Sequence, residues 1–406
     1  MGPSRKRLAA ALAIGAAAAG CGKSAPAPLP FAGKGAPGAI ALATKNTTRL
    51  GGANPVIDAA AVARAVYPGL TPATRPQLVV VVDDARWGTA LAASALAGAP
   101  LGAPLLYAHD GRLPQATLQA LRGMRPLGSS ALGGAQVLMV GTSASPPGEY
   151  RARSLARGGD PVLAGAQITA LLAKVRAKGP REAIVLCEGE APALQMPIAG
   201  LSAQSAAPIV FVARGGVPAA TAAALRRLQR PTLYLPGACV VSRRTTAALR
   251  RLGHVTRLAG GETEAGAGAG AAPTRDPVAN AVEISRFSDG SFGWGIHEAG
   301  HGLVFVSSAR PLDAPAASPL SAHGDYAPLL LVGAGRSVPS ALGRYLSNIE
   351  PGYTEAVGPV RAVYNHGWLI GDEQAISLLA QAEIDTVLEV APRTPAAGEQ
   401  ALPPPE

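Results

Sequence analysis

The chain lacks the features that would indicate a membrane transporter, a nucleic-acid-binding protein or an α/β hydrolase. After residue 20 there is no run of about eighteen apolar residues, so no later segment is long enough for a transmembrane helix. Aromatic residues make up only 4% of the sequence, and no run of Lys and Arg is interleaved with them, so nucleic acid is not expected as a partner. No Gly-x-Ser-x-Gly motif is present, which argues against the nucleophile elbow of those hydrolases.

Cysteine is scarce as well, with only Cys21, Cys187 and Cys239 in 406 residues. In an oxidising compartment Cys187 and Cys239 could form a disulfide. Each also lies in an apolar, strand-like stretch, where a free cysteine behaves as a small hydrophobic residue. The sequence leaves both possibilities open.

The N-terminus has the order of segments found in a secretory signal. Basic residues 5–7 precede a short apolar stretch, residues 8–19, and small residues then lead to Cys21. This ending resembles a bacterial lipobox, in which the cysteine is diacylated, and two acyl chains give a stable membrane anchor. We therefore expect residues 1–20 to be a lipoprotein signal peptide and Cys21 to carry the lipid. An ordinary signal peptide with a chance cysteine is the alternative.

The charge of the exported chain is positive. Residues 1–20 contain three basic and no acidic residues, so their removal lowers the net charge from +10 to +7. A positive balance on an exported protein favours acidic partners, such as anionic cell-wall polymers or anionic lipid.

One unit recurs three times along the rest of the chain. It starts at Arg49, Arg153 and Arg257, which are 104 residues apart. An Asn-Pro-Val or Asp-Pro-Val sequence follows each start, at residues 54–56, 160–162 and 276–278. Asn or Asp before Pro is typical of the first turn of a helix, because the side-chain oxygen caps a free amide and Pro tolerates the first helical position. A helix is expected after each start.

Each copy then contains three apolar runs separated by two helical stretches. The first runs are residues 78–82, 183–186 and 303–306, the second 103–107, 207–211 and 327–331, and the third 136–141, 231–237 and 361–367. A helix rich in small residues follows the first run, and a helix that begins at Pro follows the second. Continuously apolar strands are typical of parallel sheets that are covered on both faces. The pattern predicts an α/β fold made of three tandem parallel-sheet repeats.

The repeats resemble the cell wall-binding repeat type 2 family, which occurs in tandem threes on surface proteins of Gram-positive bacteria. The resemblance rests on the Arg-Leu-Gly start, the small-residue helix "DAPAASPLS" at Asp313 and the recurrent "APLLY", "APIVF" and "APLLL", and it covers residues 46–390. It implies three subdomains with approximate threefold pseudo-symmetry. It also implies non-covalent attachment to an anionic cell-wall polymer, without catalysis or a cofactor. The family's Asp at the small-residue helix is kept only as Asp313, with Thr89 and Ala193 in the other copies.

These patterns divide the chain into six segments. They are a signal peptide (1–20), a flexible tether (21–45), repeat 1 (46–150), repeat 2 (151–254), repeat 3 with loop insertions (255–390) and a disordered tail (391–406). In repeat 3 the stretch between Arg257 and Pro277 is twelve residues longer than its counterpart in repeat 2 and is rich in Gly and Ala.

Repeat 3 also contains the sequence His297-Glu298-Ala299-Gly300-His301, which matches the H-E-x-x-H signature of zinc proteases. That signature requires a helix, because spacing of i and i+4 on a helix directs both imidazoles at one metal ion. Here several Gly residues surround the motif, and His301 lies two residues before an expected strand. The sequence favours a loop over a metal site.

A ligand site is expected where the strands of repeat 3 end, because open parallel sheets bind ligands at the carboxyl ends of their strands. The residues selected there are Arg310, Asp313, Asn365, His366, Trp368 and Asp372. Arg310 could pair with phosphate and Trp368 could stack on a sugar. The alternative is a structural polar network with Asp372 as a helix cap. Weaker candidates for ligand-binding residues are Arg86 and Trp87 in repeat 1, and Glu188 and Glu190 in repeat 2.

The favoured function is therefore a lipid-anchored protein on the outer face of the cell membrane, whose repeats bind wall polymer and which is not an enzyme. A solute-binding lipoprotein of a transporter is the alternative, and it would bind its ligand in a pocket between two lobes. A zinc metallopeptidase that uses His297, Glu298 and His301 is the third hypothesis.

Overall fold

The computed structural model describes residues 38–237, 239–258, 274–323, 326–353, 358 and 363–392. The predicted signal peptide, the lipidation site Cys21 and the Gly/Ala-rich insertion at 259–273 lie outside these residues. The predicted tether is too long, because strand β1 (Ile40–Ala43) already belongs to the fold. The predicted tail begins too early, because residues 391–392 form strand β15 (Ala391–Pro392) beside β13 (Gly352–Tyr353). No helix among the described residues has both the length and the apolar character needed to span a bilayer.

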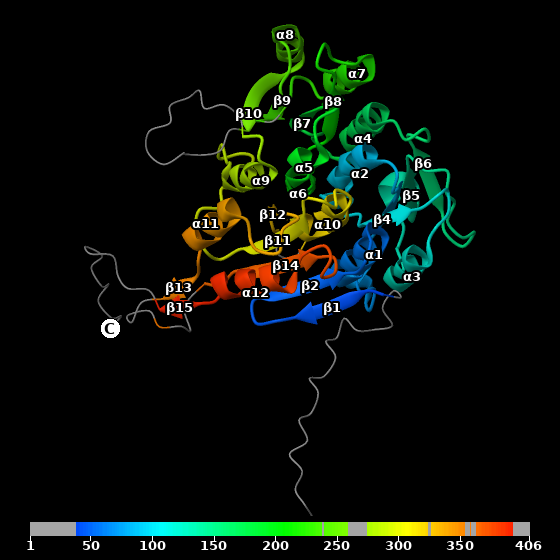
Figure 1. Ribbon diagram of the computed structural model, residues 1–406. Coiled ribbons are helices and arrows are strands. Elements are labelled where there is room, and N and C mark those ends of the chain that lie inside the picture. Colours follow the sequence, from blue (N-terminus) through cyan, green and yellow to red (C-terminus); the bar gives the residue numbers. More distant parts are fainter. Residues whose placement is uncertain are drawn as a thin grey trace, which may run out of the picture.

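Three parallel sheets with the same strand order form the body of the protein (Figure 1). The first sheet has the order β4 (Leu105–Ala108), β3 (Val79–Asp83), β5 (Val137–Val140), β6 (Ala152–Leu155). The second has the order β8 (Ile209–Val212), β7 (Glu182–Cys187), β9 (Thr232–Pro236), β10 (His254–Leu258). The third has the order β12 (Leu329–Val332), β11 (Gly302–Ser307), β14 (His366–Ile370), β2 (Thr47–Gly51), with β1 antiparallel at its edge. The predicted α/β fold of three parallel-sheet repeats is confirmed.

Each sheet takes its last parallel strand from the next repeat along the chain, and the exchange is cyclic. Strand β6 of repeat 2 pairs with β5, strand β10 of repeat 3 pairs with β9, and strand β2 of repeat 1 pairs with β14 of repeat 3. Two of the three starting arginines occupy equivalent positions in this arrangement: Arg49 lies opposite Leu369 and Arg257 opposite Leu235. Arg153 lies opposite Leu138, one position earlier in its strand, and Ser154 has the place of the other two arginines. The sequence pattern does not predict strands in these opening stretches.

The first helix of each repeat starts as the Asn/Asp-Pro signal predicts. These helices are α1 (Pro55–Val66), α4 (Pro161–Val175) and α9 (Pro277–Arg286). The Asn54 side chain accepts from the amide of Val56 at 3.1 Å, and Asp160 accepts from the amide of Leu163 at 2.7 Å. Each of them packs against helices that follow the first strand of the preceding repeat, with repeat 3 preceding repeat 1. Helix α4 packs on α2 (Trp87–Ala93), α9 on α5 (Pro192–Gln195) and α6 (Pro197–Ser205), and α1 on α10 (Asp313–Ala322).

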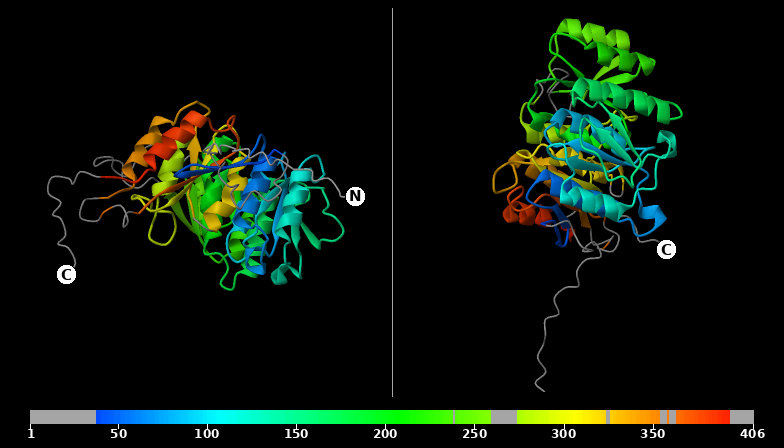
Figure 2. Two further views of the ribbon diagram at one scale, coloured as in Figure 1. Left: turned by 90° about the horizontal axis from the view of Figure 1, so that it is seen from below. Right: turned by 90° about the vertical axis from the view of Figure 1, so that its right-hand side faces the viewer.

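Helices rich in small residues meet in the middle of the molecule (Figure 2). They are α2 (Trp87–Ala93), which continues into the 3-10 helix η2 (Ser94–Ala97), α6 (Pro197–Ser205), preceded by α5 (Pro192–Gln195), and α10 (Asp313–Ala322). Ala97, Ala203 and Ala322, one from each repeat, form a buried cluster. A Cβ atom added at Gly98 would lie 2.4 Å from the Ala203 carbonyl oxygen. Small side chains are therefore what allows the three repeats to approach one another.

The remaining elements lie farther from this centre. The helices are α3 (Gln115–Met124), α7 (Ala219–Arg227), α8 (Arg243–Leu252), α11 (Ser340–Asn348) and α12 (Leu378–Val387), with short 3-10 turns η1 (Pro72–Thr74) and η3 (Ser130–Leu132). Helices α3 and α7 pack against α1 and α4 of their own repeats, and α11 packs against α9.

Arg49 joins the first repeat to the end of the third. Its guanidinium is buried, with 1% of the residue exposed, and all of its nitrogens donate hydrogen bonds. Nε donates to Gln381 of α12 at 2.9 Å, and the Nη atoms donate to the carbonyl oxygens of Gly371, Asp372 and Ile376 at 2.8–3.1 Å. A buried cation is tolerated here because each of its three nitrogens donates to at least one acceptor.

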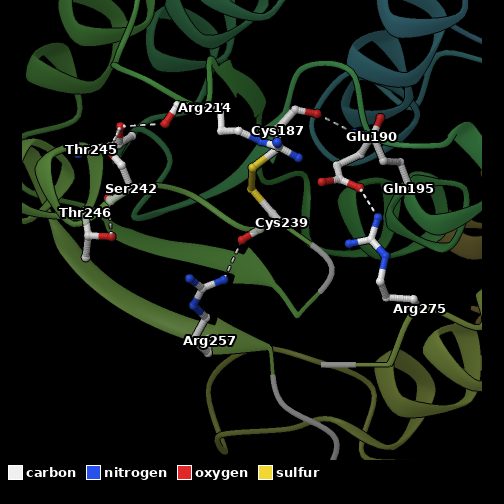
Figure 3. The surroundings of a disulfide bond; sticks show 10 residues. All are labelled: Cys187, Glu190, Gln195, Arg214, Cys239, Ser242, Thr245, Thr246, Arg257 and Arg275. Atoms are coloured by element: carbon white, nitrogen blue, oxygen red, sulfur yellow. Dashed lines mark hydrogen bonds and ion pairs between the residues drawn. A yellow bond between two sulfur atoms is a disulfide. The ribbon is translucent and has the colours of Figure 1, made fainter. Parts of the chain in front are cut away.

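Cys187 and Cys239 form a disulfide in the second repeat (Figure 3). Cys187 ends strand β7, and Cys239 lies in the loop between β9 and α8. The bond therefore holds the loop that precedes α8 against the central strand of the second sheet.

Replacing Arg49 with Met is expected to lower the free energy of unfolding by about 3–5 kcal/mol, because several buried carbonyl oxygens and the Gln381 amide lose their partner. Urea unfolding followed by circular dichroism measures this loss. Arg153→Met is the control, since Arg153 also lies in the opening strand of a repeat but is exposed, and its effect should stay within about 0.5 kcal/mol. Equal effects of the two variants would contradict the special role of Arg49.

Reduction of the disulfide is expected to lower the free energy of unfolding by about 4 kcal/mol, since the bond closes a loop between residues 52 apart in sequence. Urea unfolding with and without dithiothreitol tests this. The double variant Cys187→Ala/Cys239→Ala serves as the control, because its stability should not respond to the reductant.

Candidate functional site

The residues predicted to form one ligand site divide into two groups. Strand β14 spans His366–Ile370 and not the predicted residues 361–367. Asn365 and His366 thus lie at the amino end of the strand, while Asp372 follows its carboxyl end. A rise of about 3.3 Å per residue separates these ends by roughly 15 Å. The expectation that all six residues share one edge of the sheet is wrong. It placed the apolar residues before Asn365 in the strand, whereas the strand begins at His366.

Asn365 holds a neighbouring loop in place. It is buried, its Oδ1 accepts from the amides of Gly300 and His301 at 2.8 and 3.0 Å, and its Nδ2 donates to the Ile349 carbonyl oxygen at 2.7 Å. His366 contacts the Thr48 hydroxyl at 3.1 Å and packs edge-on against Trp368, with ring centroids 5.1 Å apart. These contacts link β14 to β2 and to the loop that precedes β11.

The H-E-x-x-H sequence lies in that same loop. Residues 297–301 contain no helix, and Gly300 has a φ of +108°, which excludes the helical spacing that the zinc signature requires. Burial lowers the pKa of His301. Within the described ranges no group of three His, Cys, Asp or Glu residues is arranged to hold a metal ion.

Arg310, Asp313 and Asp372 do lie together, at the carboxyl ends of β11 and β14. They are joined by Asp58 of helix α1, which the sequence analysis did not select. Arg310 donates from Nη2 to Asp58, its Nε lies 2.9 Å from Asp313 Oδ2, and its Nη1 lies 3.4 Å from Asp372 Oδ1. Asp58 also accepts from the Gly52 amide at 2.6 Å. Asp58 and Asp313 have no exposed surface.

Burial dominates the electrostatics of this cluster. The pKa of Asp58 is raised to about 6, because the effect of desolvation is larger than the opposing effects of Arg310 and the Gly52 amide. The pKa of Asp313 lies well above its usual value, first because of burial and then because Asp58 is adjacent. Both carboxyl groups therefore hold a proton more strongly than an exposed aspartate does, and the two share one guanidinium, that of Arg310.

Polar contacts recur at the equivalent junctions between the other repeats. The Thr89 hydroxyl, in the position of Asp313, donates to the Gly159 carbonyl oxygen at 2.8 Å. Glu190, in the position of Arg310, forms an ion pair with Arg275 at 3.2 Å. Asn280, in the position of Asp58, donates to the Leu194 carbonyl oxygen at 2.9 Å. The contacts of the Arg310 cluster are thus those of a junction between repeats. Among the described residues, this junction alone of the three has two fully buried carboxyl groups.

A concentration of arginine in repeat 2 and at the start of repeat 3 was not expected from the sequence. Residues 191–261 contain nine arginines and no aspartate or glutamate. The arginines are Arg214, Arg226, Arg227, Arg230, Arg243, Arg244, Arg250, Arg251 and Arg257, and all are exposed. Within the described part of the chain none of them is paired with a carboxylate. A count of acidic residues along the sequence would have revealed this surface, whereas a search for Lys/Arg runs with interleaved aromatics does not.

Neither a family model nor a curated protein sequence matches the chain. Solved structures do match it. Cwp6 from Clostridium difficile has a TM-score of 0.64 and 16% sequence identity, and the match covers 86% of this chain and 51% of that one. Cwp8 from the same organism has a TM-score of 0.60 and 18% identity, with 85% and 52% covered. The chain thus spans about half the length of these proteins and shares their fold.

Acidification from pH 8 to pH 5 is expected to increase the contribution of the Asp58–Asp313 pair to stability. Both carboxyl groups have raised pKa values in the folded state, so the folded protein binds more protons than the unfolded chain, and its stability falls as the pH rises. Asp313→Asn should remove at least about 1 kcal/mol of this decline, since one pKa unit corresponds to about 1.4 kcal/mol. Urea unfolding at both pH values measures the difference. Parallel pH profiles of the wild type and the variant would contradict the assignment.

Proposed function

We propose that this is a cell-surface protein whose three repeats bind an anionic cell-wall polymer non-covalently and without catalysis. The observation that carries the proposal is the fold of three parallel sheets shared with Cwp6 and Cwp8, which are cell wall proteins, over 86% and 85% of the chain. The resemblance of the repeats to cell wall-binding repeat type 2 supports the same function.

The distribution of charge supports an anionic partner. The chain without residues 1–20 carries a net charge of +7, and the nine arginines of residues 191–261 are not offset by any acid in that stretch. Such a surface raises the local concentration of a polyanion and accelerates its association.

Lipidation of Cys21 is part of the proposal and would place the protein on the outer face of the cell membrane. Two acyl chains are sufficient for stable anchoring. The wall polymer would then be bound by a protein that is itself attached to the membrane.

Two cavities formed by the described residues lie within single repeats, which is not the arrangement of a solute receptor with two lobes. One cavity, of about 480 Å³, lies within repeat 1 and is lined by Asp84, His109 and the first turns of α1 and α3. Another, of about 580 Å³, lies within repeat 2 between α7 and α8. A receptor for a small solute would enclose its ligand between two lobes, whereas each of these cavities lies within one repeat.

A sedimentation experiment with purified Gram-positive cell walls tests the proposal. Residues 22–406 are expected to sediment with intact walls and to remain in the supernatant when the anionic polymer has been stripped from the walls by acid. Binding should weaken as salt is added, because exposed charges are screened. Equal sedimentation with intact and stripped walls would refute polymer binding.

A further inference from the structure

The groove between α7 and α8 in repeat 2 is lined by basic side chains from both helices. Arg226 extends from α7, and Arg244 and Arg251 extend from α8. The groove has a volume of about 580 Å³, and none of the described residues that line it is acidic. The other lining residues include the Gly215–Gly216 turn after β8 and Thr245. Three guanidinium groups around one hollow form a site for an anion.

The geometry of α8 adds to this positive potential. Arg244, Ala248 and Arg251 are three or four residues apart, so they share one face of the helix, and that face lines the groove. The helix begins at Arg243, and the Ser242 side chain caps it by accepting from the Thr245 amide at 3.1 Å. The positive end of the helix dipole thus lies beside Arg244 and Thr245, in a helix of ten residues.

The walls of the groove are held in place by covalent and polar contacts (Figure 3). The Arg214 carbonyl oxygen accepts from the Ser242 amide at 3.4 Å and from the Thr245 hydroxyl at 3.3 Å, which ties the start of α8 to the loop after β8. The disulfide at Cys239 lies three residues before the cap and fixes the same loop to β7. A site that is already ordered loses little conformational freedom when it binds a ligand.

The arginines are not explained by the stability of the fold. Arg226, Arg244 and Arg251 line the same groove, and like charges that are brought together repel one another. The corresponding helix of repeat 3, α12, contains no arginine and carries Glu383 and Asp385 instead, although it occupies the same place between the third strand and the next opening strand. The shared architecture therefore does not require a basic helix at this position. A bound anion would offset the repulsion.

The position of the groove favours a partner in the wall over a lipid surface. Helices α7 and α8 lie at one end of the molecule, and β1 and α12 lie at the other (Figures 1 and 2). Because β1 is the first described strand after the predicted anchor, the groove is at the end of the fold away from it.

We propose that the groove between α7 and α8 binds the phosphate groups of a phosphodiester-linked wall polymer through Arg226, Arg244 and Arg251. This inference rests on the proposed function and gives it a location and a ligand chemistry. Guanidinium groups bind phosphate with charge-assisted, bidentate hydrogen bonds, and helix N-termini also favour phosphate.

The triple variant Arg226→Gln/Arg244→Gln/Arg251→Gln tests this proposal. The control Arg151→Gln/Arg153→Gln/Arg157→Gln removes the same charge from exposed positions in and beside β6. The probe is poly(glycerol phosphate), with affinity measured by titration calorimetry at low and moderate salt. We expect the groove variant to bind at least tenfold more weakly and the control to change less than twofold, with the thermal unfolding of both unchanged.

The outcomes separate the inference from the proposed function. If the wild type sediments with intact but not stripped walls and the groove variant does so equally well, the groove assignment is wrong and the proposed function stands. Equal losses in the two triple variants would show an effect of net charge alone and would also overturn the groove. Equal affinity for polygalacturonate, or stronger binding to anionic phospholipid vesicles, would overturn the phosphodiester polymer as the ligand. Wild-type protein that binds neither polymer nor walls would overturn both proposals.

Discussion

The pairing of the opening strand β2 with the closing strand β14 is the constraint on which the rest of the structure depends. It brings residues 47–51 beside residues 366–370 and so completes the third sheet with a strand from the first repeat. Two arginines then fix the loop after β14: Arg49 donates to the carbonyl oxygens of Gly371 and Asp372 on one side, and Arg310 contacts the Asp372 carboxylate on the other. Gly371 has a φ of +98°, and a Cβ atom there would lie 2.6 Å from that of Ala375, so only glycine fits this turn.

This pairing of repeat 3 with repeat 1 explains why equivalent positions at the three junctions have different side chains. Repeats 1 and 2, and repeats 2 and 3, are joined by continuous chain, and their junctions use single hydrogen bonds and an exposed ion pair. Repeats 3 and 1 meet with no peptide link between them. There the buried Arg49 and the Arg310 cluster supply directional contacts that tie the ends of the fold together.

Strands and helices with a local sequence signal could be predicted. Strands and contacts that form only when distant segments of the chain meet could not. Apolar runs placed β3, β7 and β11 within one or two residues, and the Asn/Asp-Pro pairs correctly marked the starts of α1, α4 and α9. The opening strands were missed because β6 is exposed and β2 and β10 contain buried or half-buried polar residues, so none of them is continuously apolar. Asp58 could not be linked to Arg310 from the sequence, since 252 residues separate them and only ring closure brings them together.

The pseudo-symmetry also separates what the fold requires from what it leaves free. Positions that face the axis, such as Ala97, Ala203 and Ala322, are alike in all three repeats because close approach allows little else. Outer helices escape this constraint, and there the repeats diverge: α8 carries four arginines, whereas the equivalent α12 carries Glu383 and Asp385 and uses Gln381 to bind Arg49. In repeat 3 this outer helix serves closure, which leaves the corresponding surface of repeat 2 free for an external partner. The three repeats thus share one fold but differ in role, because only the junction between repeats 3 and 1 has to hold the two ends of the fold together.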